Sequence, residues 1–175
     1  MIRQLTDADY RKMPWANGRG TTVEMLRVER GGAVLLRLSR AAVVEDGAFS
    51  LFEAIDRNLT VISGPGFDLV GKARLAALPL VPVGFPGDVA IRAEGVMGPC
   101  EDFNVMVRRG VVQAAVAVVS GGVAIGTTAL FALQPLQVAG QVMAQFDLLL
   151  TDETAEFAGH AILVTLHGLP DGALT

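Results

Sequence analysis

The chain is poor in the residues from which metal sites and disulfides are built. Its 175 residues include two histidines and one cysteine, Cys100. A single cysteine forms no disulfide within the chain, and a Cys-rich metal site needs several. His160 and His167 lie seven positions apart, so on one continuous strand they would point to opposite faces. The sequence therefore predicts no metal site, no cofactor and no disulfide framework.

Aromatic side chains and net charge are also scarce. The chain has one tryptophan and one tyrosine, and its 14 basic and 18 acidic residues leave a formal charge of −4. No basic run exceeds the pair Arg108-Arg109. Proteins that bind nucleic acids instead carry a basic patch, and many stack bases on aromatic rings. We therefore expect no nucleic-acid partner.

The first ten residues lack the basic start and apolar stretch of a secretory signal. The longest uncharged segment is 110–146, and within it Val111–Leu133 is apolar enough to compete as a membrane span. That run is rich in valine and interrupted by turn residues such as Ser120-Gly121-Gly122, a pattern typical of buried strands. The sequence predicts a cytoplasmic protein with no membrane partner.

The chain is rich in apolar residues and glycine. Hydrophobic residues make up 51% of it, and 20 glycines and eight prolines are spread along its length. No helical pattern longer than about three turns has caps at both ends. Short strands separated by turns predict an all-β sandwich or barrel. The β-prone runs are Ala33–Leu38, Asn58–Ser63, Phe67–Val70, Asp88–Ala93 and Ala161–Leu166.

At this length the chain can form one well-packed core or two small fused barrels. Residues 1–95 could build one barrel and residues 96–175 a second, with strands exchanged between the halves. We interpret residues 1–175 as a single compact unit made of these two halves.

Polar residues gather in three clusters, of which the first runs from Trp15 to Glu24. Asn17-Gly18 favours a tight turn whose backbone N–H groups could face a ligand, and Trp15 could add an apolar wall. Thr22 and Glu24, two residues apart on a predicted strand, share one face. The alternative is a tight hairpin whose tryptophan plugs the end of a barrel.

The second cluster brings an arginine into an apolar strand. Arg57 must find a partner or remain solvated, because burying an unpaired charge is costly. It could bind a ligand carboxylate through two parallel hydrogen bonds. It could equally pair with Asp56, Glu24 or Asp102 and hold loops together, and the sequence leaves both interpretations open.

In the third cluster, alternation places Asp102, Asn104 and Arg108 on one strand face. These polar groups indicate either a hydrogen-bonding site or an edge that faces water. Glu24 and Asp102 could also serve as a paired acid and base if their pKa values differed, but we prefer to interpret both as structural acids. No Gly-x-Ser-x-Gly motif is present, and we predict no catalytic residue.

Four motifs follow one another in order along the first 109 residues. They are Pro14-Trp15-x-Asn17-Gly18-x-Gly20-Thr21-Thr22-x-Glu24, Phe49-Ser50-x-Phe52-x-x-Ile55-Asp56-Arg57-x-Leu59, Phe85-Pro86-Gly87-Asp88 and Asp102-Phe103-Asn104-x-Met106-x-x-Arg109. In this order the motifs resemble the HutD/Ves family. Ala16 stands where the family usually has lysine, and Arg19 interrupts the glycine run. The C-terminal third resembles the family only in length and β character.

The resemblance implies a cupin-like double-stranded β-helix, with two fused cupin barrels (a bicupin) and little helix. It also implies a bacterial protein linked to histidine utilisation or, in the Ves branch, to environmental stress. Family members are thought to bind a small carboxylate such as urocanate or formylglutamate and to moderate the pathway without catalysis. Arg57 would then receive the carboxylate. The predicted ligand-binding residues are Trp15, Asn17, Gly18, Thr22, Glu24, Arg57, Asp102 and Asn104.

Two other functions remain open from the sequence. A metal-independent hydrolase or isomerase would act on a small acid through Glu24 and Asp102. A protein-interaction module would have no pocket ligand and would cover the apolar face between Val111 and Leu133 with a partner. Two such faces meeting would form a homodimer, although a buried core between sheets explains the same residues.

Overall fold

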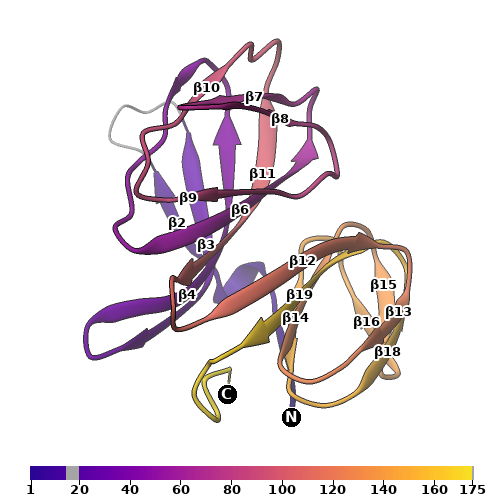
Figure 1. Ribbon diagram of the computed structural model, residues 1–175. Helices are drawn as coiled ribbons and strands as arrows, with labels where there is room; N and C mark the ends of the chain where they lie inside the picture. The colour runs from indigo at the N-terminus through magenta and orange to yellow at the C-terminus, as the bar shows by residue number, and fades with distance from the viewer. Residues whose placement is uncertain (15–19, 175) are drawn as a thin grey trace. The chain divides into compact units, whose positions relative to one another are not determined.

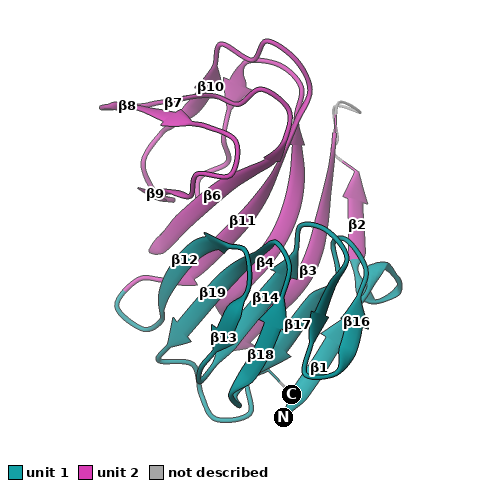
Figure 2. Ribbon diagram, turned by 90° about the vertical axis from the view of Figure 1, so that its right-hand side faces the viewer, with its two compact units in different colours: residues 1–10, 110–175 teal, residues 11–109 magenta. Residues whose placement is uncertain are grey.

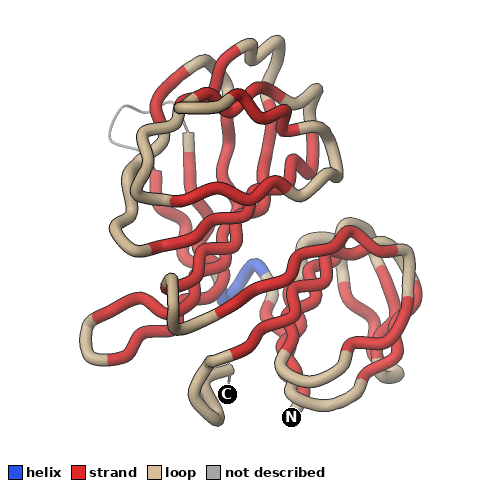
Figure 3. Tube along the Cα trace, in the orientation of Figure 1, coloured by secondary structure: helices blue, strands red, loops and turns tan. Residues whose placement is uncertain are grey.

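The computed structural model describes residues 1–14 and 20–174, which divide into two compact units (Figures 1 and 2). Unit 2 comprises residues 11–109, and unit 1 comprises residues 1–10 and 110–175. The division thus falls at residue 110, whereas the sequence interpretation put its boundary near residue 95. Strands account for most of both units, and the one helix in the described residues is the 3-10 turn Asp7–Asp9 (Figure 3). The prediction of an all-β fold is confirmed.

The larger sheet of unit 2 has six antiparallel strands in the order β2-β3-β4-β11-β6-β9. A two-residue loop, Gly31-Gly32, joins β3 to β4, and both glycines have positive φ (58° and 77°). Two-residue hairpins favour this backbone because its twist matches that of the strands. The strands are β2 Arg11–Pro14, β3 Thr21–Arg30, β4 Ala33–Val43, β6 Ile55–Ser63, β9 Val83–Pro86 and β11 Cys100–Arg108.

Strand β11 lies between β4 and β6, inside this sheet. Asp102 and Asn104 are both buried there. The third cluster therefore belongs to the interior of unit 2, and the alternative of a water-facing edge is excluded for these two residues.

A second sheet of unit 2 has four strands in the order β5-β10-β7-β8. The strands are β5 Gly47–Ala48, β7 Phe67–Val70, β8 Arg74–Ala77 and β10 Arg92–Glu94. The predicted run Asp88–Ala93 is a strand only from Arg92, because Gly87 and Asp88 form a turn that Arg109 holds. Both sheets contribute to an apolar core of Val43, Leu59, Val61, Phe67, Leu69, Ala77, Phe85, Ala93 and Cys100.

Unit 1 repeats this two-sheet plan with its own core. Its sheets have the strand orders β1-β17-β14-β19-β12 and β13-β18-β15-β16. The first strand of the chain pairs antiparallel with β17. The strands are β1 Ile2–Leu5, β12 Gln113–Val119, β13 Gly122–Ala124, β14 Thr128–Ala132, β15 Leu136–Val138, β16 Gln141–Met143, β17 Leu148–Thr151, β18 Ala155–Ala158 and β19 Ala161–His167.

The apolar run Val111–Leu133 falls on three strands of unit 1, namely β12, β13 and β14. Residues such as Leu130 and Ala132 belong to a buried core that also holds Met143 and Leu149. No helix among the described residues is long and apolar enough to cross a membrane. Burial within unit 1 thus accounts for much of the hydropathy of this run.

Candidate functional site

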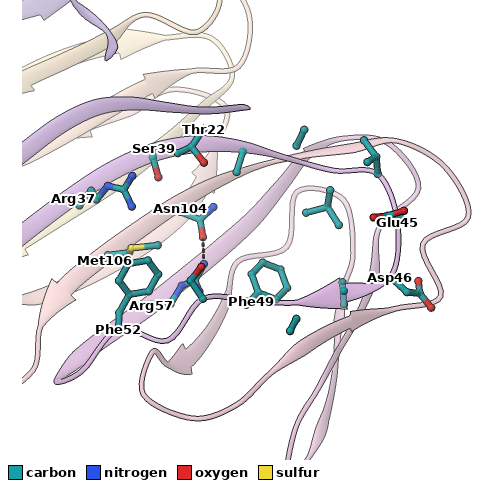
Figure 4. Close-up of a pocket in the computed structure, with 18 residues that line it drawn as sticks. Thr22, Arg37, Ser39, Glu45, Asp46, Phe49, Phe52, Arg57, Asn104 and Met106 are labelled. Atoms are coloured by element: carbon teal, nitrogen blue, oxygen red, sulfur yellow. Dashed lines mark hydrogen bonds between the residues drawn. The ribbon is translucent and has the colours of Figure 1, made fainter. Parts of the chain in front are cut away.

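Unit 2 contains a cavity of about 540 Å³, whose walls come from both of its sheets and from the 44–52 segment (Figure 4). Pockets for small molecules commonly have volumes of roughly 300–1,000 Å³, with few polar groups among apolar walls. The polar and charged residues of this cavity are Thr22, Arg37, Ser39, Glu45, Asp46, Ser50, Arg57 and Asn104.

Arg57 is the buried cation of this cavity, with 6% of its surface exposed. Its guanidinium carbon lies 5.2 Å from the ring centre of Phe49, 5.4 Å from that of Phe52 and 5.0 Å from that of Phe85. The faces of such rings attract a cation and also exclude water from it. The three phenylalanines therefore stabilise the charge of Arg57 without neutralising it.

The hydrogen bonding of Arg57 is incomplete. One terminal nitrogen donates to Asn104 Oδ1 at 3.0 Å, and the buried Nε has no partner. No carboxylate in the described part of the chain lies within ion-pair distance of this guanidinium. Burial, more than any neighbouring charge, lowers the pKa of Arg57 to about 10, so the group remains a cation at neutral pH. A buried cation with free N–H donors beside a cavity favours an anionic ligand.

Asp102 lies two residues before Asn104 on β11 and is fully buried, and it does not line the cavity. Its Oδ1 accepts a hydrogen bond from Asn104 Nδ2, and its Oδ2 has no partner. Burial raises the pKa of Asp102 to about 7, although the positive charge of Arg57 and the Asn104 hydrogen bond act in the opposite direction. Asn104 thus connects the buried acid on one side to the buried cation on the other.

Gly87 supports Arg57 from the neighbouring turn. The Phe52 amide donates to Gly87 O at 2.8 Å, and the Gly87 amide donates to Ile55 O at 2.7 Å. A Cβ at position 87 would lie 2.9 Å from Ile55 O and 3.3 Å from Arg57 Cδ. The Phe85-Pro86-Gly87-Asp88 motif therefore needs glycine because the backbone of this turn approaches Arg57 closely.

Arg109, an exposed residue, links the turn that contains Gly87 and Asp88 to the 54–56 segment. Its guanidinium pairs with Asp56 at 2.7 Å and with Asp88 through two nitrogens, at 2.7 and 3.0 Å. Its backbone amide donates to Ala54 O at 2.9 Å. Asp56, one of the partners that the sequence allowed for Arg57, is thus paired with Arg109.

Arg37 is a second cation of the cavity, and the sequence analysis missed it. Arg37 on β4 and Arg57 on β6 both lie opposite Met106 of the intervening strand β11. The charge of Arg37 is balanced by Glu24, whose Oε2 accepts from its Nε at 2.5 Å. Alternation could have found Arg37, because Arg37 and Ser39 are polar residues two apart that share one face of a largely apolar strand.

The predicted ligand-binding residues fall into three groups. Thr22, Arg57 and Asn104 line the cavity. Glu24 and Asp102 do not line it, because Glu24 pairs with Arg37 and Asp102 is fully buried behind Asn104. Trp15, Asn17 and Gly18 lie outside the described residues. That these residues bind a ligand stays a prediction.

Glu24 and Asp102 do not contact each other. Glu24 binds Arg37 and Arg27, and Asp102 binds Asn104. The paired acid and base of the enzyme alternative is therefore not assembled as a direct pair in this structure. In residues 1–14 and 20–174, no three His, Cys, Asp or Glu side chains are grouped as metal ligands.

The two-sheet units define the class: this is a cupin-like protein with an arginine-centred pocket in one unit. A cupin 2 conserved barrel domain protein from Leptotrichia buccalis shares the fold, with a TM-score of 0.55 at 8% identity over 86% of this chain and 89% of that one. The model of the family described as HutD matches residues 7–167, and the chain belongs to that family.

A solved structure of HutD from Pseudomonas fluorescens SBW25, in a formate condition, has a TM-score of 0.87 and 30% identity to this chain. The match covers 97% of this chain and 100% of that one. An uncharacterized 21.2 kDa protein in the hutC 3′ region of Pseudomonas putida is 34% identical over 60% of this chain, and Protein Ves of Cronobacter sakazakii is 33% identical over 58%. These matches span 57% and 59% of the two curated relatives.

Proposed function

We propose that this chain is a non-enzymatic binding protein for a small carboxylate metabolite. The observation that carries the proposal is Arg57, a buried cation in a cavity wall whose contacts are three aromatic rings and one amide oxygen. A carboxylate at this position would supply the missing counter-charge and accept from the remaining N–H donors. Such bidentate pairs are stronger than neutral hydrogen bonds, and more so away from water.

Several features favour binding over turnover. The carboxylates that line the cavity, Glu45 and Asp46, come from the 44–52 segment and lie at the end away from Arg57 (Figure 4), while Glu24 is neutralised by Arg37. Asp102 is separated from the cavity by Asn104. General acid–base catalysis would need a carboxyl within hydrogen-bond reach of the substrate.

The names of relatives suggest the pathway. HutD and the hutC 3′ region refer to histidine utilisation, and we propose that this chain moderates that pathway by binding an acidic intermediate such as urocanate or formylglutamate. Both molecules carry a carboxylate that suits Arg57.

Isothermal titration calorimetry with urocanate, formylglutamate, glutamate and formate tests the proposal. Arg57→Met keeps a long apolar side chain between the phenyl rings and removes the charge, and Arg57→Ala removes both. We expect either variant to lose about 30-fold or more in affinity, since breaking a buried charged pair costs about 2–5 kcal/mol. Arg92→Ala, at an exposed arginine of the same unit, is the matched control and should bind as the unaltered protein does.

Two results would contradict the proposal. One is the absence of binding of all four carboxylates to the unaltered protein. The other is equal affinity in the Arg57→Met variant, which would place the anion elsewhere.

A further inference from the structure

We propose that Asp102 links carboxylate binding at Arg57 to proton uptake, so that the pocket binds its anion together with a proton. The inference rests on the proposed function and concerns the regulation of the same site. Asp102 would act through Asn104 and Arg57, as a residue that tunes the charge of the pocket without touching the ligand.

The surroundings of Asp102 provide the first argument. Its strand neighbours at the same register are Ala41 on β4 and Val61 on β6, and neither supplies a polar side chain. Oδ1 accepts from Asn104, and Oδ2 is buried without a partner. An ionised carboxylate is expensive here, because half of its acceptor capacity is unused and no water reaches it.

The connection to Arg57 provides the second argument. Asn104 donates from Nδ2 to Asp102 and accepts at Oδ1 from Arg57, so a single amide side chain separates the two charges. Because no carboxylate among the described residues forms an ion pair with Arg57, Asp102 is the negative charge that acts on it most directly. The positive charge of Arg57 would therefore stabilise both a bound anion and ionised Asp102, and each negative charge would weaken the stabilisation of the other.

The third argument is the balance of forces on the Asp102 carboxyl. Burial raises its pKa to about 7, and the charge of Arg57 limits that rise. A bound carboxylate would cancel the limiting charge and raise the pKa of Asp102 further, by about one unit at the effective dielectric constant of a protein interior. Near neutral pH, anion binding would then draw a proton onto Asp102.

The other charged groups around this site already have partners. On the flanking strands, Arg37 pairs with Glu24, and Arg40 pairs with Glu101 at 2.7 Å. Glu101 precedes Asp102 and disfavours its ionisation. Other charged groups of the packed elements belong to surface contacts: Asp56 and Asp88 with Arg109, Asp68 and Glu94 with Arg74, Arg92 with Glu94, Arg27 with Glu29, Arg108 with the carbonyls of Val34 and Glu53, and Asp46 with the Val96 amide. Glu45 lines the cavity.

Thermodynamic linkage between proton and anion binding determines how the carboxylate affinity changes with pH. Because the complex holds more protons than the free protein, carboxylate affinity falls as pH rises through the pKa of Asp102. For a rise of one unit on binding, the association constant falls roughly three- to tenfold from pH 6 to pH 8. At pH 7, binding takes up about 0.4 proton.

Calorimetry with formylglutamate and formate at pH 6, 7 and 8 tests the inference. Neither probe titrates in this range, so proton uptake is read from the dependence of the binding enthalpy on buffer, with PIPES and imidazole as the two buffers. We expect Asp102→Asn to abolish the uptake and to flatten the pH profile. Glu101→Gln, which removes the adjacent carboxylate, is the control and should retain both.

The outcomes separate a failure of the proton linkage from a failure of the proposed carboxylate binding. Binding that depends on Arg57, without proton uptake and with a flat profile, overturns the linkage and leaves the proposed function standing. An unchanged profile in Asp102→Asn also overturns it. If neither probe binds the unaltered protein, both proposals fall.

A second measurement does not depend on the variant folding. In the unaltered protein labelled with ¹³C at aspartate Cγ, one resonance should titrate near pH 7 and move to higher pH when formate is added. If every aspartate titrates in the ordinary acidic range, the inference is wrong.

Discussion

Arg57 on β6 donates a hydrogen bond to Asn104 on β11 at 3.0 Å, and the two residues are diagonal neighbours in the sheet. Arg57 lies opposite Met106, and Asn104 lies opposite Leu59. The guanidinium therefore leans along the sheet, with its polar contact on one side and the phenyl rings of the cavity around it. This diagonal contact holds the guanidinium of Arg57 in the cavity wall.

The first prediction concerns Asn104, whose side chain forms a hydrogen bond with each of two buried ionisable groups, Arg57 and Asp102. Asn104→Leu removes the acceptor of Arg57 and the donor to Asp102. We expect the free energy of unfolding in urea to fall by about 2–4 kcal/mol. Thr60→Val, a nearby buried position whose hydroxyl has no partner, is the control and should cost little. Equal losses in the two variants would mean that the hydrogen bonds of Asn104 contribute nothing.

The second prediction is the pH dependence of stability in Asp102→Asn. The folded state holds the proton of Asp102 up to about pH 7, whereas the unfolded chain releases it near its ordinary pKa. Asp102 therefore destabilises the protein progressively as pH rises between those values. Asn cannot ionise, so the stability of the variant relative to the unaltered protein should increase by about 4 kcal/mol from pH 4 to pH 8. Urea denaturation at several pH values measures it, and a constant difference would contradict the raised pKa.

The third prediction uses Arg37 as a second cation of the pocket. Because Arg37 and Arg57 both lie opposite Met106, a ligand with two carboxylates could contact both. Removing Arg37 alone would leave the mostly buried side chain of Glu24 with only Arg27, at 3.7 Å, as a partner, so the test is the double variant Arg37→Gln with Glu24→Gln. We expect formylglutamate to bind about tenfold more weakly and formate to change little, since a partly neutralised charge contributes about 1–2 kcal/mol. An equal loss for both probes would indicate a general disturbance of the pocket.

The fourth prediction concerns Gly87. A methyl group there would lie 2.9 Å from Ile55 O and 3.1 Å from Phe52 O, two backbone atoms that cannot move independently of the turn. Gly87→Ala should therefore shift the 52–57 turn with Arg57, weaken carboxylate binding and lower stability by about 1–3 kcal/mol. Gly98→Ala, whose nearest contacts are ordinary at 3.9 Å, is the matched control. Calorimetry and thermal unfolding of both variants measure the difference, and normal binding by Gly87→Ala would show that the turn adapts.

Local patterns determined the fold class and part of the site. Alternating apolar residues between glycine turns predicted strands, and β4, β6, β7 and β19 formed where β-prone runs occurred. Four ordered motifs predicted the family, which the comparison confirms. Arg57 was identified as a functional candidate because a charged residue in an apolar strand must find a partner or a ligand.

Which side chains and strands pair with one another is determined only by the tertiary structure. Alternation along a strand determines the face on which a side chain lies, but the register between strands determines its neighbours. The sequence therefore could not tell that Asp56 pairs with Arg109, that Glu24 pairs with Arg37, or that Arg57 contacts Asn104. Nor could it show that the first strand pairs with β17, because that contact joins residues about 146 positions apart. Burial of Asp102 likewise depends on strands that pair with β11 from distant parts of the sequence.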